Sequence, residues 1–150
     1  MIRPYGDAML FPIKVDYGLR MLIDLAQQPV DSPATSSDIA SRQAIPEAFV
    51  VQLFNTLSRS GMVASRRGPK GGHMLAMPAA EISVAEVVQA FDRSIAPVGC
   101  LHSPEDCTLS SACSQRELWS EVEQILMDVL SKTSVADLAD KQRILTALPA

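Results

Sequence analysis

The sequence predicts a mostly α-helical fold with one small β-hairpin and a long helix near the C-terminus. Several segments place apolar residues at helical spacing, and the glycine-rich residues 68–72 separate two short extended runs. Apolar residues make up 47% of the 150 residues and charged residues 20%, which is typical of a globular chain. This length allows one hydrophobic core with an additional helix.

Residues 14–27 have the pattern of a first helix, because their apolar residues recur about every 3.6 positions. The apolar side consists of Val15, Leu19, Leu22, Ile23 and Ala26. After a short loop, Ser36 or Ser37 is expected to cap a short helix that ends near Arg42. Asp38 then lies in the first turn, where the helix dipole favours an acid.

A second short helix is predicted for residues 47–60, after a tight turn at residues 43–46. Pro46 suits the first helical position, and Gly61 is a suitable terminator. Its helically spaced apolar residues are Phe49, Val50, Leu53, Phe54 and Leu57. Two short helices joined by a tight turn are typical of a helix-turn-helix.

The next residues predict a β-hairpin directly after the helix-turn-helix. Residues 62–67 and 73–76 are short runs of extended character, and the intervening residues 68–72 have the composition of a turn. The combination predicts a winged helix-turn-helix with a basic, glycine-rich wing. His73 in the hairpin is expected to pack internally or to meet the partner of the wing.

The C-terminal half predicts two further helices and an irregular loop. Ser83 and Glu86 are spaced as a capping box that begins a helix at residues 84–91. Residues 94–114 show no regular pattern, and residues 115–131 form a helix with a broad apolar stripe. That stripe includes Leu118, Trp119, Val122, Ile125, Leu126 and Val129. It could pack on the first helix of its own chain, but we expect it to form the interface of a homodimer.

These elements suggest four regions. We expect a winged helix-turn-helix domain at residues 9–80, a connecting helix and cysteine loop at 81–114, a dimerisation helix region at 115–139, and a loose tail at 140–150. The dimerisation region includes a short helix at 134–138. No apolar run approaches the roughly 18 residues of a membrane span, and no signal peptide is evident, so a cytoplasmic location without membrane contact is expected.

Charge is unevenly distributed along this acidic chain, whose net charge is −4. Residues 48–80 contain no acid and four bases, namely Arg59, Arg66, Arg67 and Lys70. A local positive field is what a phosphate backbone requires, although chance clustering of surface charge would give the same count.

The helix-turn-helix and wing together predict a site for double-stranded DNA. Gln52 can bond adenine in two places, and Ala48 can contact a thymine methyl group in the major groove. Arg67 at the wing tip suits a narrow minor groove. The remaining predicted contacts are Arg59, Arg66, Lys70, Gly71 and Ser36, of which the basic residues would meet phosphates. The alternative is a winged helix that binds another protein.

Three cysteines, Cys100, Cys107 and Cys113, lie in the irregular loop and are the only cysteines in the chain. Their thiolates suit an iron–sulfur cluster or zinc, and the absence of a close Cys-x(2–4)-Cys pair favours the cluster. A disulfide redox switch is the alternative. A fourth ligand could be His102, a nearby acid, or a carboxylate from the first helix of a partner chain.

Together these features resemble the Rrf2 family of bacterial winged-helix transcriptional regulators, over residues 9–139. The most specific matches are Asp16-Tyr17-Gly18-Leu19-Arg20, Gln52-Leu53-Phe54, Gly61-Met62-Val63, the wing Arg67-Gly68-Pro69-Lys70-Gly71-Gly72, and Glu117-Leu118-Trp119. The resemblance implies a homodimer on a pseudo-palindromic operator, acting as a repressor. It also implies a 2Fe–2S or 4Fe–4S cluster on the three cysteines, sensing redox state, nitric oxide or iron.

The resemblance further assigns two residues. NsrR-like members use an aspartate of the other subunit as fourth ligand at the position of Asp16, and IscR-like members insert an arginine at the position of Arg67 into the minor groove. The chain departs from IscR-like members at Arg116, where they have a histidine, and at Val51, where they have a glutamate. The spacing between its first two cysteines is one residue longer than in IscR-like and NsrR-like members. About eight additional residues precede the position where the family's sequences usually begin.

Three other functions are compatible with the sequence to different degrees. A CymR-like regulator would work through thiols or a partner protein without a cluster. A small electron-transfer protein would hold a cluster without binding DNA. An enzyme is not expected, because no paired acid and base and no nucleophile with a neighbouring base stand out.

Overall fold

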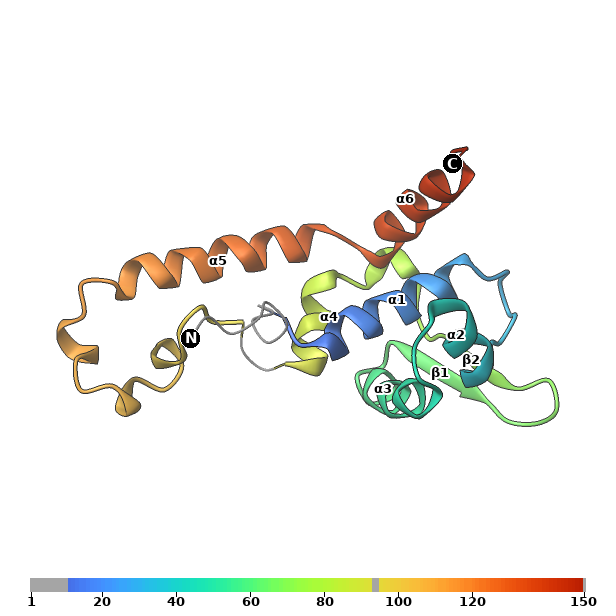
Figure 1. The fold of residues 1–150 in the computed structure, drawn as a ribbon, viewed down its shortest axis with the longest axis horizontal. Coiled ribbons are helices and arrows are strands. Elements are labelled where there is room, and N and C mark those ends of the chain that lie inside the picture. Colours follow the sequence, from blue (N-terminus) through green and yellow to red (C-terminus); the bar gives the residue numbers. More distant parts are fainter. Residues whose placement is uncertain (1–10, 93–94, 150) are drawn as a thin grey trace, which may run out of the picture.

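The computed structural model describes residues 11–92 and 95–149. Its helices and strands are α1 (Ile13–Gln27), α2 (Ser36–Gln43), α3 (Glu47–Arg59), β1 (Val63–Arg66), β2 (Gly72–Leu75), α4 (Val84–Phe91), α5 (Arg116–Lys132) and α6 (Val135–Ala147). Figure 1 shows α1 to α4 and the hairpin gathered into one body, from which α5 and the cysteine loop extend to one side. The mostly helical winged fold is therefore confirmed. Residues 9 and 10 of the predicted first region lie outside the described residues.

Helix α1 is at the centre of the hydrophobic core. Met21 and Leu22 are fully buried in a cluster that includes residues of α2, α3 and α4. Gly18 allows α4 to pack closely against α1, since a Cβ atom at this position would lie 2.2 Å from the ring of Phe91 in α4. The predicted apolar face of α3 is correct except for Phe49, which remains 39% exposed and meets the ring of Tyr17 edge-on.

The predicted caps are correct for α4 but wrong for α2. Ser83 and Glu86 form the expected capping box. Helix α2, however, is capped by Thr35, whose hydroxyl accepts from the backbone N–H of Asp38, and neither Ser36 nor Ser37 is the cap. The spacing Thr35-x-x-Asp38 makes a reciprocal capping box that a serine one or two residues later cannot form with the same acid.

The hairpin is anchored to the body by a third extended segment. Strands β1 and β2 are antiparallel, with Val63 opposite Leu75 and Arg66 opposite Gly72. Ala34 then exchanges two backbone hydrogen bonds with His73, with N···O distances of 2.9 and 2.8 Å. A Cβ atom on Gly72 would lie 2.6 Å from the carbonyl oxygen of Ala34, so a glycine is needed where the wing joins the body.

The prediction of a loose tail at residues 140–150 is wrong, because α6 continues to Ala147. Ser134 begins this helix with a capping box to Asp137, and Val135 and Ala139 are buried against the body. The guanidinium of Arg143 donates to the carbonyl oxygen of Ala26 in α1 at 3.0 Å. The apolar pattern of residues 135–147 is too weak to predict this helix. The capping box at Ser134 and the contacts of α6 with α1 stabilise it instead. No described helix is long and apolar enough to cross a membrane.

Candidate functional site

Helix α3 presents a mixed polar and apolar surface to solvent opposite its buried face. The residues expected to read bases, Ala48, Gln52 and their neighbours Val51 and Asn55, are all exposed. Arg59 is exposed at the C-terminal end, where its Nε donates to the backbone carbonyl of Asn55 at 3.2 Å. The second helix of the helix-turn-helix therefore has free side chains along the face that would enter a groove.

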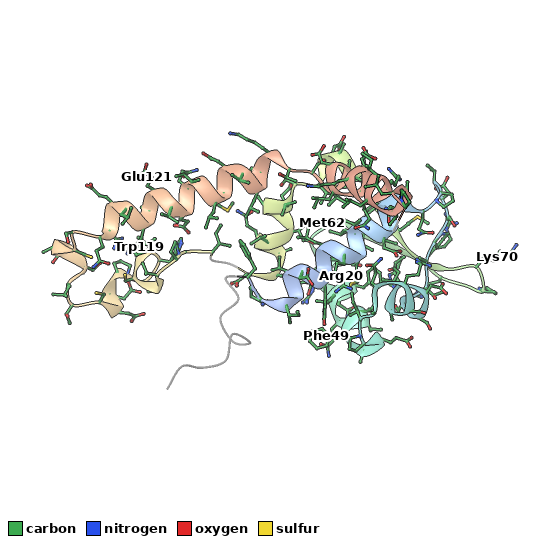
Figure 2. All side chains as sticks on the ribbon, turned by 45° about the horizontal axis from the view of Figure 1, so that its top comes forward. Arg20, Phe49, Met62, Lys70, Trp119 and Glu121 are labelled. Carbon is green, nitrogen blue, oxygen red and sulfur yellow. The ribbon has the colours of Figure 1, made fainter. Side chains whose placement is uncertain are left out.

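The wing tip holds three exposed cations. Arg66, Arg67 and Lys70 form no ion pair with any part of the chain that the structure describes, and Figure 2 shows Lys70 at the outer end of the wing. Gly71 has a structural role in this turn. Its N–H donates to Gly68 at 2.9 Å, and a Cβ atom there would lie 2.2 Å from the carbonyl oxygen of Arg66. The tight turn keeps the cations at the tip.

His73 joins the wing to both helices of the helix-turn-helix. Its ring stacks on Phe54 of α3, with centroids 3.7 Å apart and planes 11° apart. Its Nδ1 lies 2.9 Å from the hydroxyl of Ser65, and its Nε2 lies 3.2 Å from that of Ser36. Of the two expectations for His73, the structure supports internal packing. His73 also contacts the hydroxyl of Ser36, a residue that the sequence predicts to contact DNA.

Stability is expected to fall with acidification more steeply in the wild type than in the His73→Phe variant. Burial lowers the pKa of His73 from its ordinary value of 6.5. Below about pH 6.5 the unfolded chain therefore binds the proton first, and stability decreases until the folded-state pKa is passed. Hydrogen bonds in the capping boxes lower the pKa values of Asp38, Glu86 and Asp137, so these acids titrate below this window. Urea unfolding between pH 7 and 5 measures this, and equal slopes would contradict it.

Asp24 is a charged residue buried in the core, and it was not among the predicted site residues. It is 2% exposed and accepts from Nε and Nη2 of Arg42 at 2.9 and 2.6 Å. The side-chain amide of Gln43 donates to it at 2.9 Å. An acid in the middle of the apolar segment of α1 is the signal that could have revealed this pair, which joins α1 to α2.

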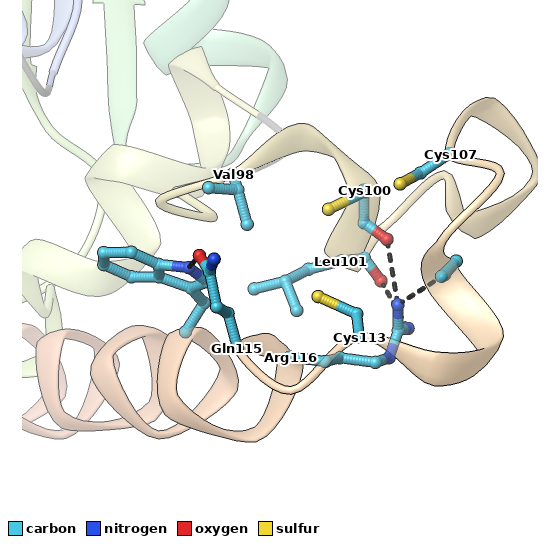
Figure 3. Close-up of a pocket in the computed structure, with 9 residues that line it drawn as sticks. Val98, Cys100, Leu101, Cys107, Cys113, Gln115 and Arg116 are labelled. Carbon is cyan, nitrogen blue, oxygen red and sulfur yellow. Dashed lines mark hydrogen bonds between the residues drawn. The ribbon is translucent and has the colours of Figure 1, made fainter.

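The three cysteines line one small cavity of about 90 Å³ at the start of α5. All three are free and partly buried, and apolar walls are supplied by Val98, Leu101 and Trp119 (Figure 3). Among residues 11–92 and 95–149, no group of three ligands converges closely enough to hold a single metal ion. Three thiols around one cavity are the type of ligand that an iron–sulfur cluster takes, with the thiolates shared among its iron atoms.

Arg116, in the first turn of α5, lines the same cavity, and its guanidinium is directed at the backbone of the cysteine loop (Figure 3). Its Nη1 donates to the carbonyl oxygen of Cys100 at 3.1 Å and to the hydroxyl of Ser110 at 3.0 Å, and its Nη2 donates to the carbonyl oxygen of Leu101 at 3.4 Å. These acceptors are neutral, and Arg116 forms no ion pair within the described part of the chain. A cavity lined by three thiols and an arginine fits an anionic, thiolate-ligated group.

The structure separates the candidate fourth ligands. His102 is held by Glu123 of α5, with Nε2 and Oε1 2.6 Å apart, and does not line the cavity. Asp16 lies on α1 with its side chain 51% exposed and 3.6 Å from Arg20. In Figure 1 the cysteine loop lies alongside and past the N-terminal part of α5, to one side of the body that contains α1. Asp16 is therefore not brought to the cysteines of its own chain.

Helix α5 carries an apolar stripe that the described part of the chain covers only in part. None of its residues is buried, although Leu126 and Leu130 pack against the core beside α4. Leu118, Ile125 and Val129 are 54%, 55% and 59% exposed. Trp119 and Val122 are partly buried, with the indole N–H of Trp119 donating to the Gln115 side chain at 3.2 Å.

Comparison with known proteins decides the family. The profile of the Rrf2 family, described as "Iron-dependent Transcriptional regulator", matches residues 11–141. The chain belongs to the Rrf2 family. It is a DNA-binding transcriptional regulator with a winged helix-turn-helix, as its sequence predicts. The cation-bearing wing and the exposed face of α3 are thus the parts of an Rrf2 regulator expected to meet DNA.

Individual relatives support the same assignment. The Rrf2 chain is 34% identical over 129 residues to the HTH-type transcriptional regulator IscR of Photorhabdus laumondii, a match that covers 86% of this chain and 78% of the relative. IscR of Yersinia pestis is 33% identical over the same lengths. Among solved structures, CymR, the global cysteine regulator of B. subtilis, has a TM-score of 0.72 at 28% identity and covers 94% of this chain and 98% of its own. T. potens IscR shares the fold, with a TM-score of 0.76 at 23% identity over 97% and 95% of the two chains.

Proposed function

We propose that this Rrf2 regulator is a homodimeric repressor that binds a pseudo-palindromic operator and senses redox state, nitric oxide or iron through an iron–sulfur cluster. The observation that carries the proposal is the cavity at the start of α5, which is lined by three free thiols and by Arg116. Cys100, Cys107 and Cys113 would hold the cluster. When bound, it would supply a centre that responds to oxidants, nitric oxide and iron supply.

The apolar stripe of α5 supports the homodimer. Leu118, Ile125 and Val129 are each more than half exposed, which is costly for a helix that stays alone in water. In a two-fold symmetric dimer with its axis beside α5, the stripe of one subunit would pack against the same stripe of the other. It would also place two reading heads on one duplex, as a pseudo-palindromic operator requires.

Asp16 of the partner subunit completes the proposed ligand set. Its carboxylate is half exposed on α1, so a partner can reach it, and His102 is already held by Glu123. Arg20, which pairs with Asp16, also donates to the backbone carbonyl of Gln43, the last residue of α2. A ligand on α1 would therefore be connected to the helix-turn-helix of the subunit that donates it.

The contacts proposed for DNA follow from the exposed residues. Gln52 and Ala48 would read bases, Arg67 would enter the minor groove, and Arg59, Arg66 and Lys70 would bind phosphates. Ser36 and Gly71, which are only partly exposed and bonded within the chain, would lie at the edges of this interface.

Anaerobic purification tests this function. The expected protein is coloured, contains iron and sulfide, and gives a Mössbauer spectrum that identifies the cluster type, while sedimentation equilibrium gives the mass of a dimer. It should also retard a duplex operator selected from a random pool. An iron-free dimer that binds DNA would support a CymR-like thiol regulator instead, and a cluster protein without DNA binding would support electron transfer.

Mixed dimers are expected to restore the native cluster spectrum if Asp16 acts across the dimer. One chain carries Asp16→Ala, and the other carries Cys100→Ser, Cys107→Ser and Cys113→Ser. Only the mixed dimer unites three cysteines with an intact Asp16 of the other subunit, so its spectrum should be native at half the wild-type iron content. Each variant alone should show an altered cluster or none. Ligation within one chain predicts no native spectrum in the mixed dimer.

A further inference from the structure

We infer that Arg116 is a positioning residue, which holds the cysteine loop ready for an anionic, thiolate-ligated group and stabilises that group by its charge. The inference rests on the proposed cluster function and deepens it. It concerns a residue that ligates nothing itself.

The first reason is the connection that Arg116 makes within the loop. Its carbonyl acceptors belong to Cys100 and Leu101 in the first turn of the loop, and its hydroxyl acceptor belongs to Ser110 in the last turn. Arg116 itself lies in the first turn of α5. One side chain thus closes the segment that contains Cys107 and fastens it to a helix.

The planar shape of the guanidinium is essential to this connection. Its N–H groups point in fixed directions, so one arginine can serve three acceptors on different sides. A lysine would keep the positive charge but could not hold all three acceptors in the same geometry. The two functions of Arg116, fastening the loop and supplying charge, can therefore be separated by substitution.

The second reason is the charge of Arg116. The side chain is partly buried, yet its acceptors are two carbonyls and one hydroxyl rather than a carboxylate of the described chain. Hydrogen bonds and ion pairs with an anion are stronger than those with neutral acceptors. Three cysteines line the same cavity, and their thiolates with a bound cluster would provide that anion.

The experiment compares Arg116→Lys, Arg116→Gln and a control, Arg143→Gln. Arg143 also donates to a backbone carbonyl and is 51% exposed, but it lies on α6, away from the cysteines. Hydrogen exchange is measured first on metal-free, reduced protein. We expect faster exchange across residues 99–113 in both Arg116 variants and wild-type exchange there in the control.

The second measurement uses the iron-loaded proteins. Arg116→Gln should lower the reduction potential, since a neutral side chain no longer favours the added electron, whereas Arg116→Lys should stay near the wild-type potential. Iron release to a chelator should be about 10-fold faster in Arg116→Gln, as is typical when a residue that supports metal ligands is removed.

The outcomes distinguish this inference from the proposed function. A wild-type protein that takes up no iron contradicts the proposed function, and Arg116 then loses the group it would stabilise. A wild type that loads normally, with exchange, potential and iron release unchanged in Arg116→Gln, overturns the inference about Arg116 alone. Equal potentials in the lysine and glutamine variants would overturn the role of its charge.

Discussion

The Arg42→Ala variant is expected to lose about 2–3 kcal/mol of its free energy of unfolding, because it leaves a buried carboxylate without its cation. Asp24 is 3% exposed at its side chain and accepts two hydrogen bonds from Arg42. Removing one partner of a fully buried pair costs about 3–5 kcal/mol. The smaller loss of about 2–3 kcal/mol is expected here because Arg42 is 41% exposed, so water can replace part of its contact with Asp24. Urea unfolding at pH 7 measures the loss.

A double-mutant cycle separates the pair from other effects of the substitution. Asp24→Asn removes the charge but keeps an acceptor for Gln43. Adding Arg42→Ala to Asp24→Asn should therefore cost less than it does in the wild type. Arg67→Ala is the matched control, since this exposed arginine makes no hydrogen bond or ion pair with the described residues, and it should leave stability unchanged. Additive losses in the cycle would show that Asp24 and Arg42 are not coupled.

Arg67→Ala is expected to weaken operator binding about 10- to 100-fold, in line with the roughly 1–3 kcal/mol that a specific arginine contact contributes. The side chain is exposed at the wing tip and forms no ion pair in the described chain, so its charge is available to DNA. A narrow minor groove has the most negative potential and attracts such a side chain. Fluorescence anisotropy on a duplex operator measures the affinity.

Comparison with other basic residues shows whether the effect is specific. Arg59→Ala should weaken binding less and similarly for all sequences, because phosphate contacts carry little sequence information. Arg67→Ala should also reduce the preference for A·T over G·C pairs under the wing. Iron content and unfolding free energy should stay at wild-type values in both variants. Wild-type affinity in Arg67→Ala would exclude the wing from the operator complex.

Local signals in the sequence determined much of this fold. The period of 3.6 in α1 and α3, the capping box of Ser83 and the glycine-rich turn before Gly72 depend on residues only a few positions apart. The exposed residues of α3 and the basic wing followed from the same local patterns. The spacing of the cysteines indicated a thiol-rich site, but it did not show how their side chains are arranged.

Long-range packing decided the remaining features. The stack of His73 on Phe54, the pair of Asp24 with Arg42 and the contact of Arg143 with α1 each join segments that lie 18 or more positions apart. No periodicity or turn pattern encodes such pairs, because they depend on how the helices pack. The extent of α6 and the place of Arg116 among three cysteines have the same cause. The sequence by itself thus determined the winged helix-turn-helix and the three thiols. Only the tertiary structure placed Arg116 in the lining of their cavity and left Leu118, Ile125 and Val129 of α5 uncovered by the described residues.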